Sequence, residues 1–203
     1  MTKSTFLALA LAASGIFSAA QAATAWNESV SGDLSNVGTA PTGVNLVAGS
    51  NLVLGATGRN TSGVVDRDYF TFTLPTGFQL NALNLLPGST FLGPESISFI
   101  AIQSGPQVTV NPTGGSAAGL LGWWLYSAND IDTDILQLMA SSPGAVGYVG
   151  ALPAGTYSVW VQETGTGVAN YNFDFQVTAV PEPATAASLL AGLAALGWLA
   201  RRR

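Results

Sequence analysis

The sequence alternates most regularly between apolar and polar residues at Tyr171-Asn172-Phe173-Asp174-Phe175-Gln176-Val177-Thr178. Because side chains of a β-strand point alternately to its two faces, the three aromatic rings and Val177 share one face and the polar residues share the other. A strand of this kind covers a core on one side only, as is common in antiparallel sheets. The stretch therefore predicts a half-buried strand in an antiparallel sheet.

Two earlier stretches show the same alternation. Phe70, Phe72 and Leu74 fall on one face of a strand that begins near Asp66. In the strand from Thr156 to Glu163, Tyr157, Val159 and Val161 share one face and alternate with Ser158, Trp160 and Gln162. The Gly-rich turn at residues 164–167 separates the latter strand from the final one, which predicts a terminal antiparallel hairpin. No segment of residues 23–180 has a sustained helical period. The sequence thus predicts an all-β fold, a single antiparallel β-sandwich with jelly-roll-like character.

Three tryptophans are candidates for a ligand-stacking surface. Trp123 and Trp124 are adjacent, so a strand would direct them to opposite faces, one into the core and the other toward an exposed face or an edge. Trp160 lies on the more polar face of its strand. An exposed indole suits the apolar face of a sugar ring, although packing of all three rings within the fold is the alternative.

One group of acidic residues is a candidate calcium site. Asp130, Asp132 and Asp134 alternate along a polar segment that resembles the start of a calcium loop, but Ile135 replaces the expected glycine and Ser141 the closing glutamate. The alternative is a solvated acidic turn.

Both ends of the chain have the character of targeting segments. Lys3, an apolar run and Ala20-Gln21-Ala22 predict a secretory signal peptide over residues 1–22. Uncharged residues 184–200 predict one short transmembrane helix, and the arginines that follow favour a cytoplasmic C-terminus. These arginines are Arg201, Arg202 and Arg203. The exported domain is then expected to span residues 23–180.

The composition of residues 23–180 restricts the function. Ten acids stand against two bases, Arg59 and Arg67, which gives a net charge of −8 and excludes nucleic acid as a partner. The whole chain has no histidine or cysteine, and Lys3 is its only lysine. The common nucleophile–base arrangements and zinc sites therefore lack their residues. We expect no enzymatic activity; a carboxylate-dependent glycosidase is the least favoured alternative.

The C-terminal segment resembles the PEP-CTERM sorting signal of Gram-negative bacteria. The resemblance rests on Pro181-Glu182-Pro183, the apolar segment after it and the terminal arginines. It implies that residues 181–203 hold the protein transiently in the inner membrane, where exosortase recognises the tripeptide and removes the tail during export. It also implies a cell-surface or extracellular location and association with exopolysaccharide or biofilm material.

A second resemblance concerns the exported domain. Asp66-Arg67-Asp68-Tyr69-Phe70 at one strand entrance and Pro153-Ala154-Gly155-Thr156-Tyr157 at another are similar to bacterial pre-peptidase C-terminal domains. Those are jelly-roll-like β-sandwiches of secreted enzymes, and some bind calcium or extracellular polymers. The resemblance implies that Asp66 and Asp68, at a strand entrance, are candidate calcium ligands. The main expectation is thus an exported, non-enzymatic matrix protein without a cofactor other than calcium. The alternative is a carbohydrate- or protein-binding module, either with or without a requirement for calcium.

Overall fold

The computed structural model describes residues 22–92, 97–180, 191–193, 197 and 200–201. The predicted signal peptide, the Pro181-Glu182-Pro183 tripeptide and most of the predicted transmembrane segment lie outside these residues. Of the C-terminal segment, residues 191–193, 197, 200 and 201 have helical backbone conformation. Within the part of the chain that the structure describes, no helix has both the length and the apolar character needed to cross a bilayer.

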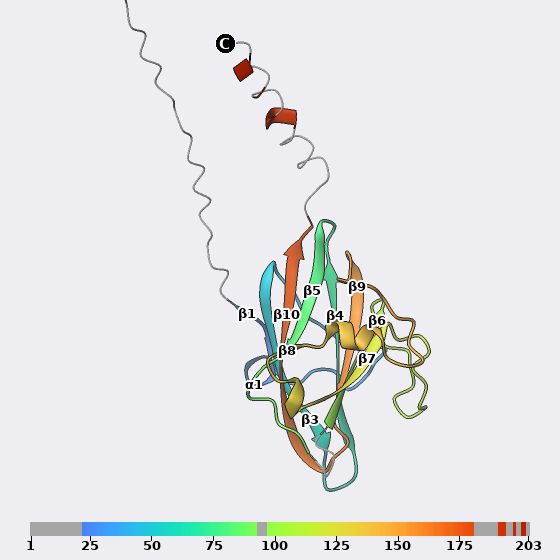
Figure 1. Ribbon diagram of the computed structural model, residues 1–203. Helices are drawn as coiled ribbons and strands as arrows, with labels where there is room; N and C mark the ends of the chain where they lie inside the picture. Colours follow the sequence, from blue (N-terminus) through green and yellow to red (C-terminus); the bar gives the residue numbers. More distant parts are fainter. Residues whose placement is uncertain (1–21, 93–96, 181–190, 194–196, 198–199, 202–203) are drawn as a thin grey trace, which may run out of the picture.

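β-strands are the main regular secondary structure of the described domain (Figure 1). The first five strands are β1 (Ala23–Asn27), β2 (Thr42–Gly43), β3 (Gly49–Arg59), β4 (Val65–Leu74) and β5 (Phe78–Leu85). The other five are β6 (Ile97–Ser104), β7 (Gly122–Ser127), β8 (Thr133–Asp134), β9 (Gly155–Gln162) and β10 (Gly167–Ala179). Three short helical turns lie between strands, namely α1 (Glu28–Ser31), η1 (Ala128–Asp130) and α2 (Leu136–Ala140).

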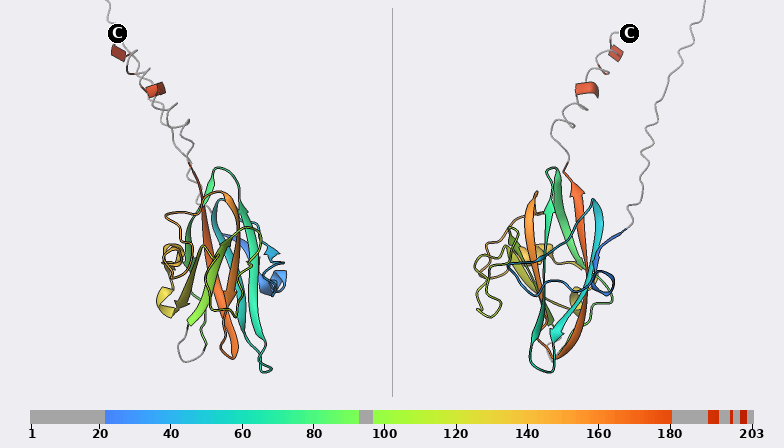
Figure 2. Two further views of the ribbon diagram at one scale, coloured as in Figure 1. Left: turned by 90° about the vertical axis from the view of Figure 1, so that its right-hand side faces the viewer. Right: turned by 180° about the vertical axis from the view of Figure 1, so that it is seen from behind.

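The strands form one curled sheet whose two halves face each other (Figure 2). One half has the order β1-β3-β10-β5-β8 and the other β2-β4-β9-β6-β7. Most pairs are antiparallel, and the halves join where Gly58 and Arg59 of β3 pair with Asp66 and Val65 of β4. The predicted all-β, antiparallel sandwich is confirmed.

The main core lies between the two halves and contains the apolar faces predicted from alternation. Phe70 and Phe72 of β4 meet Phe175 of β10 in edge-to-face contacts, with centroids 5.8 and 5.7 Å apart. Phe173 is likewise buried and lies edge-to-face against Tyr126 of β7. Aromatic rings in such contacts add to the stabilisation gained from area burial alone.

The predicted terminal hairpin is wrong. β9 pairs with β4 and β6, whereas β10 pairs with β3 and β5, so the Gly-rich turn carries the chain from one half of the sheet to the other. β10 therefore lies inside its half of the sheet, with a hydrogen-bonded neighbour on each side. The pattern of a strand identifies its buried face but not its partners, which explains the error.

A smaller core covers the outer face of the β4-β9-β6-β7 layer. The chain after β6 folds over this face before it returns as β7, which pairs with β6 in a long hairpin. Val108 and Leu120 of this connection pack against Tyr69, Ala101 and Trp160. The outer face of the second half is consequently partly apolar, and it carries the groove described below.

Candidate functional site

A groove lies on the outer face of the second half of the sheet, beside the long β6–β7 connection. It has a volume of about 740 Å³, and its lining includes the aromatic residues Phe99, Trp123 and Trp160. The Phe99 ring lies 4.6 Å from that of Trp160 and 6.1 Å from that of Trp123, measured between centroids. Three aromatic rings from three neighbouring strands thus form one continuous surface.

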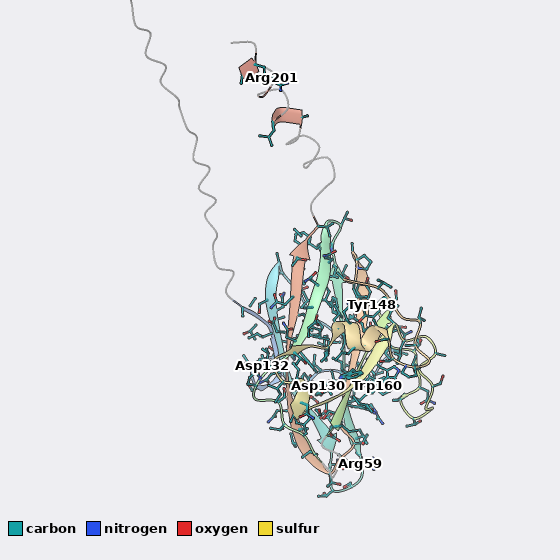
Figure 3. All side chains as sticks on the ribbon, in the orientation of Figure 1. Arg59, Asp130, Asp132, Tyr148, Trp160 and Arg201 are labelled. Atoms are coloured by element: carbon teal, nitrogen blue, oxygen red, sulfur yellow. The ribbon has the colours of Figure 1, made fainter. Side chains whose placement is uncertain are left out.

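The three predicted tryptophans have different environments. Trp123 is half-buried, and its indole N–H donates to the Pro143 carbonyl at 3.1 Å, which fixes the ring at the groove. Trp160 is only 5 % exposed and belongs to the smaller core, and it also lines the groove (Figure 3). Trp124 points to the other face of β7 and packs against the main core. Of the three, Trp123 is the one whose ring is both in the groove and accessible.

Other groove residues set its chemistry. Leu125 is 44 % exposed and adds apolar surface at the edge strand, while Asn111, Ser116 and Gln162 offer amide and hydroxyl groups. The groove residues that the structure describes include no carboxylate. An aromatic surface with scattered neutral polar groups is typical of a site that binds neutral polar molecules such as sugars.

The predicted calcium loop does not bring its carboxylates together. Asp130 accepts hydrogen bonds from the Ser127 amide at 2.8 Å and from the Trp124 indole at 3.3 Å. Asp134 accepts from the amides of Leu83 and Leu136, both at 2.9 Å. Both carboxylates therefore serve the local fold.

Asp132, the middle residue of that loop, is exposed (Figure 3). Its φ of 63° lies in the left-handed region, which aspartate tolerates better than most residues do. In the described part of the chain, Asp130, Asp132 and Asp134 do not form a group of three converging carboxyl oxygens. The residues are thus close in sequence and separate in the fold.

The second predicted pair, Asp66 and Asp68, is also divided. Asp66 is half-buried and accepts a hydrogen bond from the Asn36 amide at 2.7 Å. Asp68 points into the sandwich, where it is fully buried, and accepts a hydrogen bond from the Tyr171 hydroxyl at 2.7 Å. Its neighbours are Glu28 and Asp33, and one carboxyl oxygen of each of these three residues lies within 4.8 Å of the others.

Electrostatics within this acidic cluster of Glu28, Asp33 and Asp68 favour protonation. Burial and then the nearby Glu28 raise the pKa of Asp68 to about 9, and the Tyr171 hydrogen bond opposes this rise. Burial is also the largest cause of the raised pKa values of Glu28 and Asp33. Three carboxyl groups at such short distances repel one another when ionised.

The sequence did not indicate Phe99, Glu28 or Asp33 as site residues. Phe99 shares its strand with a nearly continuous apolar run, so nothing local separates it from core residues. Glu28 and Asp33 precede Asp68 by 40 and 35 positions, as their numbers give directly, and no local motif joins them. The aromatic groove and the acidic cluster are therefore both brought together by strand pairing, which a single sequence does not reveal.

Comparisons with known proteins identify the C-terminal segment. Residues 179–203 match the PEP-CTERM protein-sorting motif. No significant match was found among curated proteins or among solved structures. The resemblance to pre-peptidase C-terminal domains therefore stays a prediction.

The match defines the class of protein. The chain is an exported protein that is anchored in the membrane and then processed, with exosortase as the processing partner. The chain carries a PEP-CTERM sorting signal directly after a curled antiparallel β-domain.

Proposed function

We propose that the exported domain is a non-enzymatic surface or extracellular-matrix protein of a Gram-negative bacterium that associates with exopolysaccharide in biofilm material. The observation that supports this most is the aromatic groove of Phe99, Trp123 and Trp160 on a domain that is exported. Sugar rings present apolar C–H faces that pack on aromatic rings, while their hydroxyl groups bond to neutral polar side chains.

The charge of the domain favours a neutral polysaccharide. Residues 23–180 carry ten acids and two bases, so an anionic polymer would be repelled at low ionic strength. Neither arginine lines the groove itself: the Arg59 Nε–H donates to the Thr164 carbonyl, and the Arg67 Nε–H donates to the side chain of the groove residue Gln162 at 2.9 Å. A neutral polymer fits this surface better than an acidic one does.

A glycosidase is a weaker alternative. Glycoside hydrolysis needs two carboxyl groups on either side of the bond that is cleaved. The described residues that line the groove contain none, and Asp68 of the acidic cluster is fully buried, out of reach of a polymer. A protein partner in the same groove is the other alternative, and a polysaccharide-binding experiment distinguishes it from the proposal.

The experiment is retention of the purified protein by insoluble exopolysaccharide from its own host. We expect the wild-type protein to be retained and Trp123→Ala to bind at least about tenfold more weakly, the change that about 1.4 kcal/mol produces. A protein that passes through unretained, with its fold verified by melting, contradicts the proposal.

Trp26→Ala is a matched control for this experiment. Like Trp123, Trp26 is half-buried, and its indole N–H donates to a backbone carbonyl, that of Gly32, at 3.1 Å. It belongs to β1, in the half of the sheet that does not carry the groove. We expect this variant to be retained as the wild type is. Equal losses in both variants would assign the effect to stability and not to the groove.

A further inference from the structure

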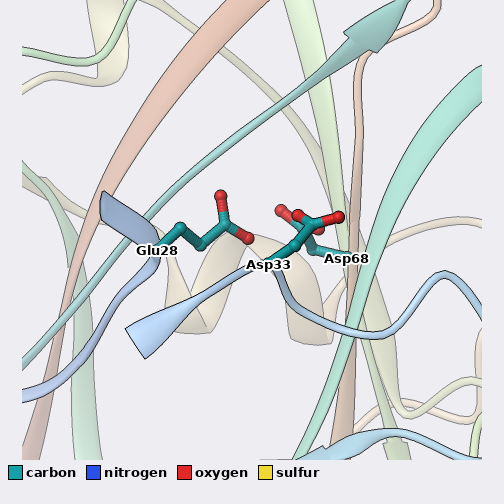
Figure 4. Close-up of side chains that lie close together, drawn as sticks. All are labelled: Glu28, Asp33 and Asp68. Carbon is teal, nitrogen blue, oxygen red and sulfur yellow. The ribbon is translucent and has the colours of Figure 1, made fainter. Parts of the chain in front are cut away.

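The acidic cluster is assembled from three separate segments of the chain. Glu28 begins α1, Asp33 follows this helix, and Asp68 points inward from β4 (Figure 4). Since β1 pairs with β3 and β2 pairs with β4, the segment that joins β1 to β2 crosses from one half of the sheet to the other. It passes over the place where β3 and β4 separate. The three carboxyl groups thus converge where the two halves of the sheet are joined.

Backbone groups hold Glu28 in place. Its two carboxyl oxygens accept hydrogen bonds from the amides of Leu34 at 3.1 Å and Ala56 at 2.8 Å. Gly55 leaves room for this arrangement, because a Cβ atom there would lie 2.8 Å from Glu28 Cδ and 2.2 Å from the Tyr171 hydroxyl oxygen. Each carboxyl oxygen that accepts one amide hydrogen still has a free lone pair. The carboxyl group is therefore fixed and can still accept a further ligand.

Asp68 supplies the observation that points to a ligand. Its side chain is fully buried, and its Oδ1 atom has no hydrogen-bond partner among the residues that the structure describes. The same holds for Thr57 Oγ1, which lies two residues beyond Gly55 on β3 and so on the same face of that strand. An unsatisfied buried oxygen is costly, and it is most costly when the group is charged.

We propose that Glu28, Asp33 and Asp68 bind a calcium ion. Carboxylate and hydroxyl oxygens are hard ligands, and calcium accepts irregular arrangements of them more readily than magnesium does. A cavity of about 640 Å³ is lined by Asp33, Thr57 and Asp66, and also by Arg59, so the Asp33 side of the cluster borders a solvent-filled space. Extracellular calcium modules bind the ion in the millimolar range, which suits an exported protein.

The ion would have a structural effect. It would join α1 and the loop after it to β4, and it would offset the repulsion among three carboxylates at the junction of the two halves of the sheet. This inference does not depend on the groove, which lies on the outer face of the second half. Calcium would then stabilise the domain only after export, where the ion is abundant.

The test is thermal melting of the protein purified from its host, in a chelator and in millimolar calcium chloride at pH 8. A ligand that binds only the folded state raises the melting temperature. For a chain of this size and the affinity of extracellular modules, we expect a rise of about 3–10 °C. An unchanged melting temperature overturns the proposal and leaves a shared proton as the explanation of the cluster.

Two variants of the cluster and two controls assign the response to these residues. Asp68→Asn keeps an acceptor for the Tyr171 hydroxyl but removes the charge, and exposed Asp33→Asn is a second variant that does not disturb the core. Both should lose most of the calcium response. Asp132→Asn in the β7–β8 loop and Asp174→Asn, a buried carboxylate outside the cluster, should keep it. A response that survives in both cluster variants, or that Asp132→Asn abolishes, overturns the assignment.

Discussion

Asp68 is a carboxyl group without solvent contact, so its ionisation is linked to folding. Its pKa rises from an ordinary value of 3.8 to about 9 through burial, then through the charge of Glu28, with smaller contributions of the same sign from Asp66 and Asp33. The Tyr171 hydroxyl donates a hydrogen bond to it and acts in the opposite direction. The folded protein therefore retains a proton that the unfolded chain has released above about pH 4.

The sign of the pH dependence follows from this retained proton. A folded state that binds more protons than the unfolded state loses stability as the pH rises. Without a divalent cation, we expect the melting temperature to fall between pH 4 and about pH 9. Asp68→Asn cannot ionise, so its melting temperature should fall much less over this window. A wild-type melting temperature that is constant or rises with pH in chelator contradicts this account.

At this scale the sequence allowed only part of the acidic cluster to be predicted. Asp68 was a candidate, together with Asp66, only through the resemblance to pre-peptidase C-terminal domains, and the structure gives these two residues different neighbours. Glu28 and Asp33 were not predicted, because their proximity to Asp68 arises from pairing of β1 with β3 and of β2 with β4. Contacts that depend on such pairing have no local sequence pattern.

At the scale of elements, β10 shows what alternation does and does not reveal. Tyr171, Phe173, Phe175 and Val177 are all buried on the predicted face. Asp174 lies on the opposite face as predicted, yet it is only 7 % exposed. It accepts hydrogen bonds from the Ser50 hydroxyl at 2.7 Å and the Asn51 amide at 3.0 Å. The alternation thus shows which face of β10 is apolar. It does not show that β3, the neighbour of β10 in the sheet, buries Asp174 on the other face through hydrogen bonds from Ser50 and Asn51.

Substitutions in β10 should therefore follow a graded order. Phe175→Ala removes a fully buried ring that contacts β4, and we expect it to lower the free energy of unfolding by about 3–5 kcal/mol. In the wild type, the side-chain amide of Gln176 donates a hydrogen bond to Asp174 Oδ2. Asp174→Asn puts an NH2 donor in place of this oxygen, and losing the bond should lower the free energy of unfolding by about 1–2 kcal/mol. Exposed Thr178→Ala should change it by less than about 0.5 kcal/mol. Denaturant melts measure the order, and equal effects at all three positions would contradict the described burial.

At the scale of the whole molecule, the folded domain reaches the sorting signal without a linker. β10 ends at Ala179, and the Val180 amide still donates to the Gly77 carbonyl at 2.8 Å. The sorting motif is matched from residue 179 onward. An exosortase that acts at Pro181-Glu182-Pro183 must therefore approach a folded sheet within a few residues of the tripeptide.

Replacement of Pro181-Glu182-Pro183 by three alanines separates sorting from simple anchoring. The change preserves the apolar residues 184–200 and the arginines, whose transfer through the bilayer costs several kcal/mol or more. We expect the wild-type chain to lose its tail and the variant to accumulate at full length in the inner membrane. The β-domain should melt at the same temperature in both, because its core residues all precede residue 180. Intact-mass measurement of protein from both strains decides the matter, since a wild-type chain that still ends at Arg203 in a host with exosortase would show that the motif is not processed.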